Sequence, residues 1–311
     1  MRIIFFGSDD FAAVHLEKLL ASGFDVCACV APPDKAKDRG MKVKFSPVKE
    51  IGARENIPVF QPETVKDKSF IEELKFFNSD LFIVIAYGKI LPNDIFAIPK
   101  LFAVNVHGSL LPRYRGAAPV NWAIINGEKE TGLSIIKMNA AMDAGDIIAQ
   151  QRMEISPSDT AVTLREKMMR QGPEFLAKTI IDLKRGAKSV MLIVQNEQDV
   201  TWAPKLTKEL GKIDWNQTAE KIHNLARGLR PWPCAYTYLG DKMLKILVSQ
   251  VMDIRPGPTP GEVVEIKKDG FIVATGHGGL FVKEVHLQAA KAMDAGSFIR
   301  GQRIGVGYNF Q

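Results

Sequence analysis

Two side chains that suit acyl-transfer chemistry lie two residues apart in the otherwise apolar stretch "FAVNVH". If this stretch is a strand, Asn105 and His107 project from the same face and emerge together at its carboxyl end. The next strand candidate, "GLSIIKM", runs into "NAAMDAGDII", a turn that carries Asp143. This pattern places an amide, an imidazole and a carboxylate at neighbouring strand ends, without a serine nucleophile or a set of metal-ligating residues. It favours transfer of an acyl-level group to an amine.

Each member of this trio has a role in such a transfer. His107 can protonate or hydrogen-bond a developing oxyanion, Asn105 can donate to it, and the carboxylate of Asp143 can orient and charge the imidazole or relay a proton. The same residues also have simpler interpretations. A histidine at a strand end is often a surface residue, aspartates form turns, and Arg113 and Arg115 in the following loop suit solvated charges. Spacing alone leaves both interpretations open.

The elements that would position these side chains follow an α/β pattern. The opening "MRIIFFGSDDFAAVHLEKLLASGFDVCACVAPPD" predicts a strand, a helix and a second strand. The runs "FNSDLFIVIAYGKILP" and "KLFAVNVH" are typical of strands buried on both faces of a parallel sheet. In "SPVKEIGAREN", Ser46 suits a helix cap and Pro47 the first helical position. We therefore expect a doubly wound, mostly parallel, Rossmann-like sheet, whose ligands bind outside the carboxyl ends of its strands.

Motifs for the common cofactors are missing from the sequence. "FFGSDDF" follows the first predicted strand but lacks G-x-G-x-x-G, and no G-x-x-x-x-G-K-[ST] loop occurs, so we expect neither NAD nor ATP. Cys27, Cys29 and Cys234 form neither a disulfide framework nor a metal-ligand set. We interpret the three cysteines as small core residues of a protein in a reducing compartment, and we expect no bound metal.

The C-terminal third has a different pattern. A helical stretch from Thr160 to Arg185, interrupted around Gly172 and Pro173, is followed by a polar, weakly periodic connector. Short apolar runs separated by Gly, Pro and Asp turns then predict a small OB-like β-barrel. This last part carries more Lys and Arg than Asp and Glu, as a nucleic-acid accessory domain would. The expected bounds are 1–189 for a catalytic domain, 190–207 for a linker and 208–311 for the barrel.

Composition and charge fit a globular protein with an anionic partner. The 311 residues are 46% hydrophobic and 24% charged, with a formal net charge of +6 and a pI of about 9.1. The sequence opens without a signal-peptide pattern, and no apolar run approaches the length of a membrane span. We expect a soluble, cytoplasmic protein without a membrane partner.

Several longer motifs together resemble one family. "NVHGSLLPRYRGAAP", "AMDAGDII", "SPVKE", "IPVFQP", "VIAYGKILP" and "DVTWAPKLTKELGKIDW" resemble, in order and over nearly the whole chain, the bacterial methionyl-tRNA formyltransferases. The Asn-x-His core alone would indicate only the wider folate-dependent formyltransferase superfamily. The resemblance implies transfer of the formyl group of 10-formyltetrahydrofolate to the α-amino group of methionine on initiator tRNA, by a one-carbon group transferase of translation initiation.

The resemblance also implies residue roles. Family catalytic roles fall on Asn105, His107 and Asp143. Asn105 and His107 would stabilise the tetrahedral oxyanion, and Asp143 would set the charge of His107 and help move the proton. The folate donor would lie against two segments: Ser109, Leu110, Leu111 and Pro112 in the loop, and Tyr87, Gly88, Lys89, Ile90 and Leu91 at the end of the preceding strand.

A basic segment matches the place where the family inserts a loop that meets the tRNA acceptor end. This segment, "PPDKAKDRGMKVKFSPVK", contains Arg39, Lys42 and Lys44, and Arg39 is the foremost candidate for phosphate contact. Its residues after "RG" depart from the family pattern, and a charge run alone would favour a solvated loop. Lys205 in "APKLTKE" matches a family lysine near the domain junction. The resemblance implies initiator methionyl-tRNA as partner, and we expect a monomer.

Two other functions share parts of this pattern. A folate-dependent nucleotide-amino-sugar formyltransferase would share the trio and the folate pocket, but the basic segment, "RGAAP" and "APKLTKELGKIDW" favour the tRNA enzyme. A non-catalytic tRNA-binding module would explain a basic loop and a small barrel. Such a module would not need Asn105 and His107 paired with an aspartate turn.

Overall fold

The computed structural model describes residues 1–37, 42–186 and 191–310, with only the backbone described for residues 35–37 and 42–44. The chain forms two compact units. Unit 1 comprises Met1–Gly116, Gly132–Met153 and Glu166–Trp202, and unit 2 comprises Ala117–Thr131, Glu154–Arg165 and Ala203–Gln311. Arg39, one of the predicted tRNA contacts, lies outside the described residues.

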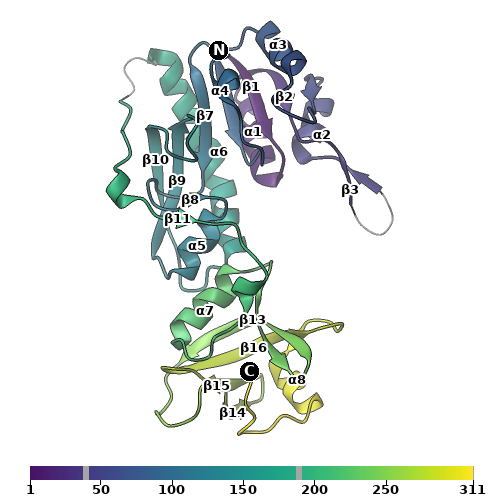
Figure 1. Cartoon of the computed structure of the whole chain (residues 1–311), viewed down its shortest axis with the longest axis vertical. Helices are drawn as coiled ribbons and strands as arrows, with labels where there is room; N and C mark the ends of the chain where they lie inside the picture. The colour runs from purple at the N-terminus through teal and green to yellow at the C-terminus, as the bar shows by residue number, and fades with distance from the viewer. Residues whose placement is uncertain (38–41, 187–190, 311) are drawn as a thin grey trace. The chain divides into compact units, whose positions relative to one another are not determined.

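The helices and strands follow the chain in this order (Figure 1). They are β1 (Arg2–Gly7), α1 (Asp10–Ala21), β2 (Asp25–Val30), β3 (Lys35–Lys37), β4 (Lys42–Lys44), α2 (Pro47–Arg54), β5 (Val59–Phe60), α3 (Lys68–Phe76), β6 (Leu81–Ile85), α4 (Asn93–Phe96), β7 (Phe102–His107), β8 (Arg115–Gly116), α5 (Pro119–Ile125), β9 (Glu130–Lys137), β10 (Ile147–Glu154), α6 (Ala161–Gly186), η1 (Glu197–Asp199), β11 (Trp202–Ala203), η2 (Glu209–Gly211), α7 (Ala219–Gly228), β12 (Ala235–Leu239), β13 (Lys242–Met252), β14 (Val263–Lys267), β15 (Gly270–Ala274), β16 (Gly279–Leu287), β17 (Met293–Asp294) and α8 (Ala295–Gly301).

Unit 1 is built on a seven-stranded sheet in the order β10-β9-β7-β6-β1-β2-β5. The pairs β1–β2, β1–β6, β6–β7 and β2–β5 are parallel, and β7–β9 is antiparallel. The predicted strand-helix-strand opening and the mostly parallel α/β sheet are therefore confirmed. One face packs on α3 and α4 through a cluster that includes Phe6, Phe82, Phe70 and Ile95. The central strands are buried on both faces, as their continuous apolar runs require.

Two local predictions about helices had different outcomes. Ser46 caps α2 by accepting a hydrogen bond from Lys49 N at 3.2 Å, with Pro47 at the first turn, as predicted. The predicted interruption of the later helix at Gly172 and Pro173 is wrong, because α6 runs through both residues. A Cβ at Gly172 would lie 2.6 Å from Nε2 of His15, so this glycine permits close packing. Tertiary packing outweighs the intrinsic helix cost of the Gly-Pro pair.

Unit 2 contains an antiparallel sheet in the order β12-β13-β16-β15-β14, with β17 paired to β16. Its core joins α7, through Ile222 and Ala226, to strand residues such as Leu244 and Val285. The helix α7 packs on β13 and β16 (Figure 1). The short apolar runs of the C-terminal third therefore form the antiparallel strands of one small domain with its own core.

The three cysteines are free. Cys29 lies in the core, and burial raises the pKa of its thiol to about 12, as expected for a small core residue. Among the described residues, no helix is both long enough and apolar enough to span a membrane.

Candidate active site

Strand β7 carries the first two members of the predicted trio. Asn105 is half-buried and pairs with Val84 of β6, whereas His107 is 6% exposed and pairs with Ser134 of β9. Because residues two apart share one face of a strand, both side chains project on the same side of the sheet. The strand therefore presents a polar edge at the end of an apolar run, as the alternation predicts.

Asp143 joins these two residues from the turn after β9. Its Oδ1 lies 3.4 Å from Nδ2 of Asn105, and its Oδ2 lies 3.6 Å from Nδ1 of His107. Oδ2 also accepts a hydrogen bond from the backbone N–H of Gly116 at 2.9 Å. The structure thus brings Asp143 against two residues of β7, the first of which, Asn105, lies 38 positions earlier in the sequence.

The second nitrogen of His107 is also occupied. Nε2 lies 2.9 Å from the carbonyl oxygen of Tyr114, which only accepts hydrogen bonds, so Nε2 carries a hydrogen. A neutral ring then leaves Nδ1 without a hydrogen toward Asp143. Only the doubly protonated ring presents N–H groups to both Tyr114 and Asp143.

The turn that holds Asp143 depends on an unusual backbone. Asp143 has φ +52°, in the left-handed region that non-glycine residues rarely adopt. Two residues later, a Cβ on Gly145 would lie 1.7 Å from the carbonyl oxygen of Lys137. The chain therefore needs glycine at residue 145 to fold the turn against the end of β9.

Two residues that hold this turn were not among the predicted site residues. Gln195 is buried, and its Nε2 donates to the carbonyl oxygens of Asp143 at 2.8 Å and Gly145 at 2.7 Å. Its Oε1 accepts from Nε of Arg115 at 3.0 Å. Arg115 is 3% exposed, so its interpretation as a solvated charge is wrong, whereas Arg113 is exposed. No local spacing signals a contact between residues 80 positions apart.

The loop segment of the predicted folate site is tightly bonded within unit 1. Ser109 Oγ donates to Arg113 O at 2.6 Å, and the backbone N–H of Leu111 donates to Ser134 Oγ at 3.0 Å. Leu111 is buried, whereas Leu110 and Pro112 are half-buried. These hydrogen bonds hold the loop in a defined conformation.

The strand-end segment of the predicted folate site contains both buried and exposed residues. Tyr87 and Leu91 are buried, and burial raises the pKa of Tyr87 to about 12. Gly88 is exposed with φ +78°, and Ile90 is 79% exposed. Lys89 Nζ donates to the carbonyl oxygens of residues 62 and 63 at 2.8 and 2.9 Å. Gly88 and Ile90 are therefore the residues of this segment that are most accessible to a ligand.

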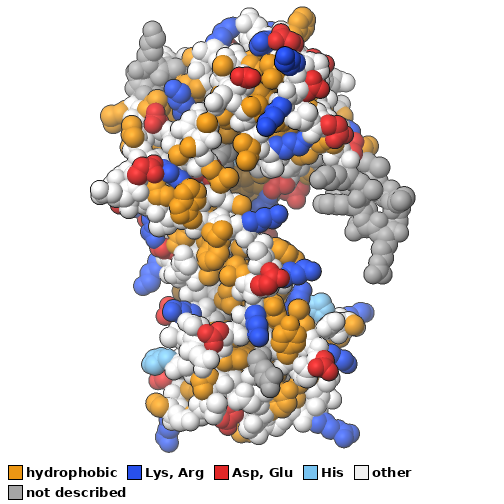
Figure 2. All heavy atoms as spheres, in the orientation of Figure 1, with side chains coloured by type: hydrophobic (Ala, Val, Ile, Leu, Met, Phe, Trp, Pro, Cys, Tyr) orange, Lys and Arg blue, Asp and Glu red, His pale blue; other side chains and the backbone are white. Residues whose placement is uncertain are grey.

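The predicted tRNA contacts are only partly described. Lys42 and Lys44 belong to β4, which pairs with β3 in a two-stranded antiparallel sheet. Lys205 is exposed in unit 2. Figure 2 shows cationic and anionic side chains interspersed on the face in view, so net charge alone does not mark a nucleic-acid surface there.

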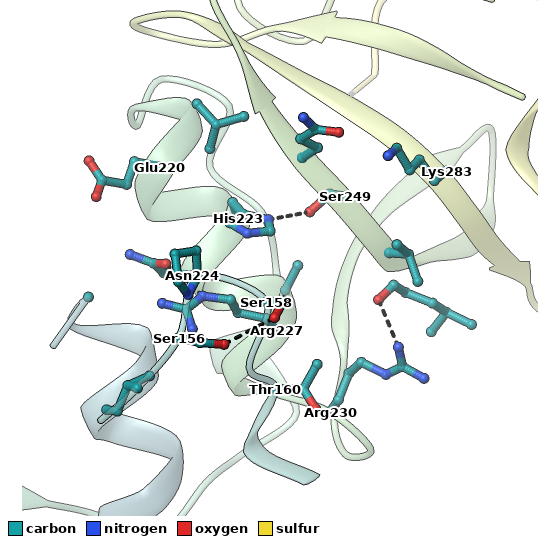
Figure 3. A pocket seen from close by; sticks show the side chains of 18 of the residues that line it. Ser156, Ser158, Thr160, Glu220, His223, Asn224, Arg227, Arg230, Ser249 and Lys283 are labelled. Carbon is teal, nitrogen blue, oxygen red and sulfur yellow. Dashed lines mark hydrogen bonds between the residues drawn. The ribbon is translucent and has the colours of Figure 1, made fainter. Parts of the chain in front are cut away.

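Unit 2 also contains a cavity of about 690 Å³ between α7, residues 155–160 and β13 (Figure 3). His223 bonds to Ser249 Oγ at 3.0 Å across it. Arg227 donates to the carbonyl oxygen of Asp159 and to the side-chain oxygen of Asn224, both at 2.9 Å. The cations that line the cavity are Lys129, Arg227, Arg230 and Lys283.

Comparisons with known proteins decide the family. Residues 1–180 match the family model described as formyl transferase, and residues 205–303 match the one described as formyl transferase, C-terminal domain. A methionyl-tRNA formyltransferase of Caldanaerobacter subterraneus subsp. tengcongensis is 44% identical over 308 residues, which cover 99% of both chains. The one of Clostridioides difficile is 41% identical over 307 residues, again covering 99% of both. The chain belongs to the methionyl-tRNA formyltransferase family. The resemblance seen in the motifs is thereby confirmed.

Solved structures share the fold of this methionyl-tRNA formyltransferase family member. An N-formyltransferase of Helicobacter canadensis, in complex with folinic acid and dTDP-3-aminofucose, matches with a TM-score of 0.66. It is 20% identical, over 90% of this chain and 98% of its own. At that identity the likeness shows the fold alone. Among the described residues, no group of three or more His, Cys, Asp or Glu side chains is arranged to hold a metal.

Proposed function

We propose that this chain transfers the formyl group of 10-formyltetrahydrofolate to the α-amino group of methionine on initiator tRNA, producing N-formylmethionyl-tRNA in the cytoplasm. The observation that carries the proposal is the meeting of Asn105, His107 and Asp143 in a chain that is 44% identical, over its full length, to a methionyl-tRNA formyltransferase.

The trio supports a direct transfer. The methionyl amine attacks the formyl carbon and forms the new C–N bond, while the carbonyl oxygen becomes an oxyanion. Asn105 and His107 donate hydrogen bonds to that oxyanion. Asp143 stabilises the charged imidazole and helps move the proton released by the amine. The bond from carbon to N10 then breaks, N10 takes up the proton, and tetrahydrofolate leaves.

The folate donor would lie against residues 87–91 and 109–112. The hydrogen-bonded loop around Ser109 and Leu111 supports this assignment, because a loop that is already ordered loses little conformational freedom when a ligand binds. Tyr87 and Leu91 would line the pocket floor, and the exposed Ile90 would cover apolar surface of the donor. Gly88 and Lys89 would shape the strand end between them.

The tRNA would contact the basic segment near the N-terminus, Lys205 and the C-terminal third of the chain. Arg39, Lys42, Lys44 and Lys205 are the proposed phosphate contacts, and we assign catalysis to residues 1–189, a linker to 190–207 and tRNA binding to 208–311. Three cations of this last part, Arg227, Arg230 and Lys283, line the unit 2 cavity together with Glu220, and they support a phosphate contact there. We propose a monomer.

A formylation assay with the purified chain tests the proposal. We expect formyl-methionine on charged initiator tRNA in the presence of 10-formyltetrahydrofolate, and no product when the folate is omitted. Charged elongator tRNA provides the matched control for tRNA choice. Absence of this activity together with rapid formylation of a nucleotide-linked amino sugar would overturn the assignment.

A further inference from the structure

The segment before β11 runs beside the turn that carries Asp143. Ile193 and Ile147 exchange backbone hydrogen bonds at 2.8 and 2.9 Å, which align this segment with the start of β10. Thr201 accepts from Arg115 through its carbonyl oxygen at 2.9 Å and from Tyr114 N through Oγ1 at 2.8 Å. The segment of residues 191–202 is therefore bonded at both ends to other parts of unit 1.

Between these attachments, Gln195 brackets the Asp143 turn. Its amide nitrogen donates to the carbonyl oxygens of Asp143 and Gly145, and these two bonds fix which end of the amide is nitrogen. The side chain is 6% exposed, so water cannot readily replace a lost bond. One buried amide thus restrains the backbone on both sides of residue 144.

Arg115 fixes the position of Gln195. Its Nε donates to Gln195 Oε1 at 3.0 Å, and its two terminal nitrogens donate to the carboxylate of Glu197 at 2.9 and 3.2 Å. The adjacent Gly116 N–H binds the Asp143 carboxylate. Residues 115 and 116 therefore restrain Asp143 twice, through its backbone by way of Gln195 and through its side chain directly.

The restraint has a physical purpose. Asp143 adopts a left-handed conformation that costs free energy in a non-glycine residue, so surrounding bonds must stabilise it. The Asp143 carboxylate lies 3.4 Å from Asn105 and 3.6 Å from His107. A small shift of the backbone at Asp143 would change both distances. A displacement of about 1 Å at a reacting site can lower a rate about a hundredfold.

We propose that Gln195 and Arg115 form a positioning pair that sets the Asp143 carboxylate against Asn105 and His107. The pair acts through Asp143, and the inference depends on the proposed role of Asp143 in formyl transfer.

Substitutions at Gln195 test the pair. Gln195→Glu keeps the size and an acceptor for Arg115 but removes both donors to the turn, and Gln195→Ala removes all three bonds. We expect both to lower kcat by about tenfold to a hundredfold, the scale of a misplaced group. The KM for charged tRNA and the dissociation constant of tetrahydrofolate should stay unchanged. Gln198→Ala, an exposed glutamine three residues later, is the matched control and should keep the wild-type kcat.

A double-variant cycle separates positioning from general support of the fold. If Gln195 acts through Asp143, adding Gln195→Ala to Asp143→Asn should lower kcat little further. Full additivity of the two losses, or wild-type kcat in folded Gln195→Glu, would overturn the inference. Failure of the proposed function looks different, because the wild-type chain would then not formylate methionyl-tRNA at all.

Discussion

Oδ2 of Asp143 lies 3.6 Å from Nδ1 of His107 while it accepts a hydrogen bond from Gly116 N at 2.9 Å. The backbone donor holds the carboxylate in place, and this leaves its charge directed at the imidazole. His107 is buried, so an opposite charge at this distance acts with less solvent screening than on the surface. The carboxylate of Asp143 therefore faces the imidazole of His107 directly.

Replacing the Asp143 carboxylate with an amide tests its role. Asp143→Asn keeps the size of the side chain but removes the charge and the capacity to accept a proton. We expect kcat for formyl transfer to fall at least about a hundredfold, the range of positioned acid-base groups. Tetrahydrofolate binding, measured by calorimetry, should remain near the wild-type value. Turnover close to wild type would remove Asp143 from the mechanism.

The sequence predicted the core of this site but not its support. Asn105 and His107 follow from the two-residue period of a strand, and the sheet follows from continuous apolar runs. Neither pattern reports side-chain bonds between distant segments. The buried bond from Arg115 to Gln195 spans 80 positions, and Gln195 lies in a stretch whose polar composition is typical of a linker. The helix through Gly172 likewise depends on packing against His15, which local propensity does not contain.

Gly145 provides a steric test of the same turn. An alanine Cβ would lie 1.7 Å from Lys137 O, so the backbone must move. We expect Gly145→Ala to displace Asp143 and lower kcat by about tenfold or more, with a lower melting temperature. Gly301→Ala is the control, because a Cβ there meets no atom within 4 Å. Unchanged kcat and melting temperature in Gly145→Ala would mean that the turn accepts a side chain at residue 145 without moving Asp143.

His15 predicts a pH dependence of stability. The side chain is fully buried, Nδ1 bonds to Phe11 O at 2.7 Å, and burial lowers its pKa from 6.5 to about 4. The unfolded chain therefore binds more protons between these values, so the stabilisation present above pH 6.5 is lost as pH falls toward 4. We expect the free energy of unfolding to fall by about 3 kcal/mol over that window, relative to His15→Leu.

Urea denaturation of both proteins at pH 7, 5.5 and 4 measures this difference. The comparison with His15→Leu removes the titration of the carboxyl groups that the two proteins share. Parallel loss of stability in the two proteins would show that His15 titrates alike in the folded and unfolded states.

Arg39 tests the basic segment, and its prediction comes from the sequence alone. Arg39→Ala should raise the KM for charged tRNA and reduce the slope of log affinity against log salt by about one, as loss of a phosphate contact does. Tetrahydrofolate binding should stay unchanged. Arg185→Ala, an exposed arginine on α6, is the matched control. Weaker folate binding with intact tRNA affinity would mean that the segment serves the donor.

Arg230 tests whether the unit 2 cavity contributes a separate phosphate contact. Its Nη1 lies 3.4 Å from Leu247 O, a long bond that leaves the guanidinium available to a stronger acceptor in the cavity. Arg230→Met should weaken tRNA binding several-fold and lower the salt slope by about one, while kcat at saturating tRNA stays unchanged. Lys291→Met removes an exposed charge that does not line the cavity and should leave both values as in the wild type.

Because independent phosphate contacts add, Arg39→Ala combined with Arg230→Met should lower the slope of log affinity against log salt by about two. Equal slopes in Arg230→Met and the wild type would assign the cavity no part in tRNA binding.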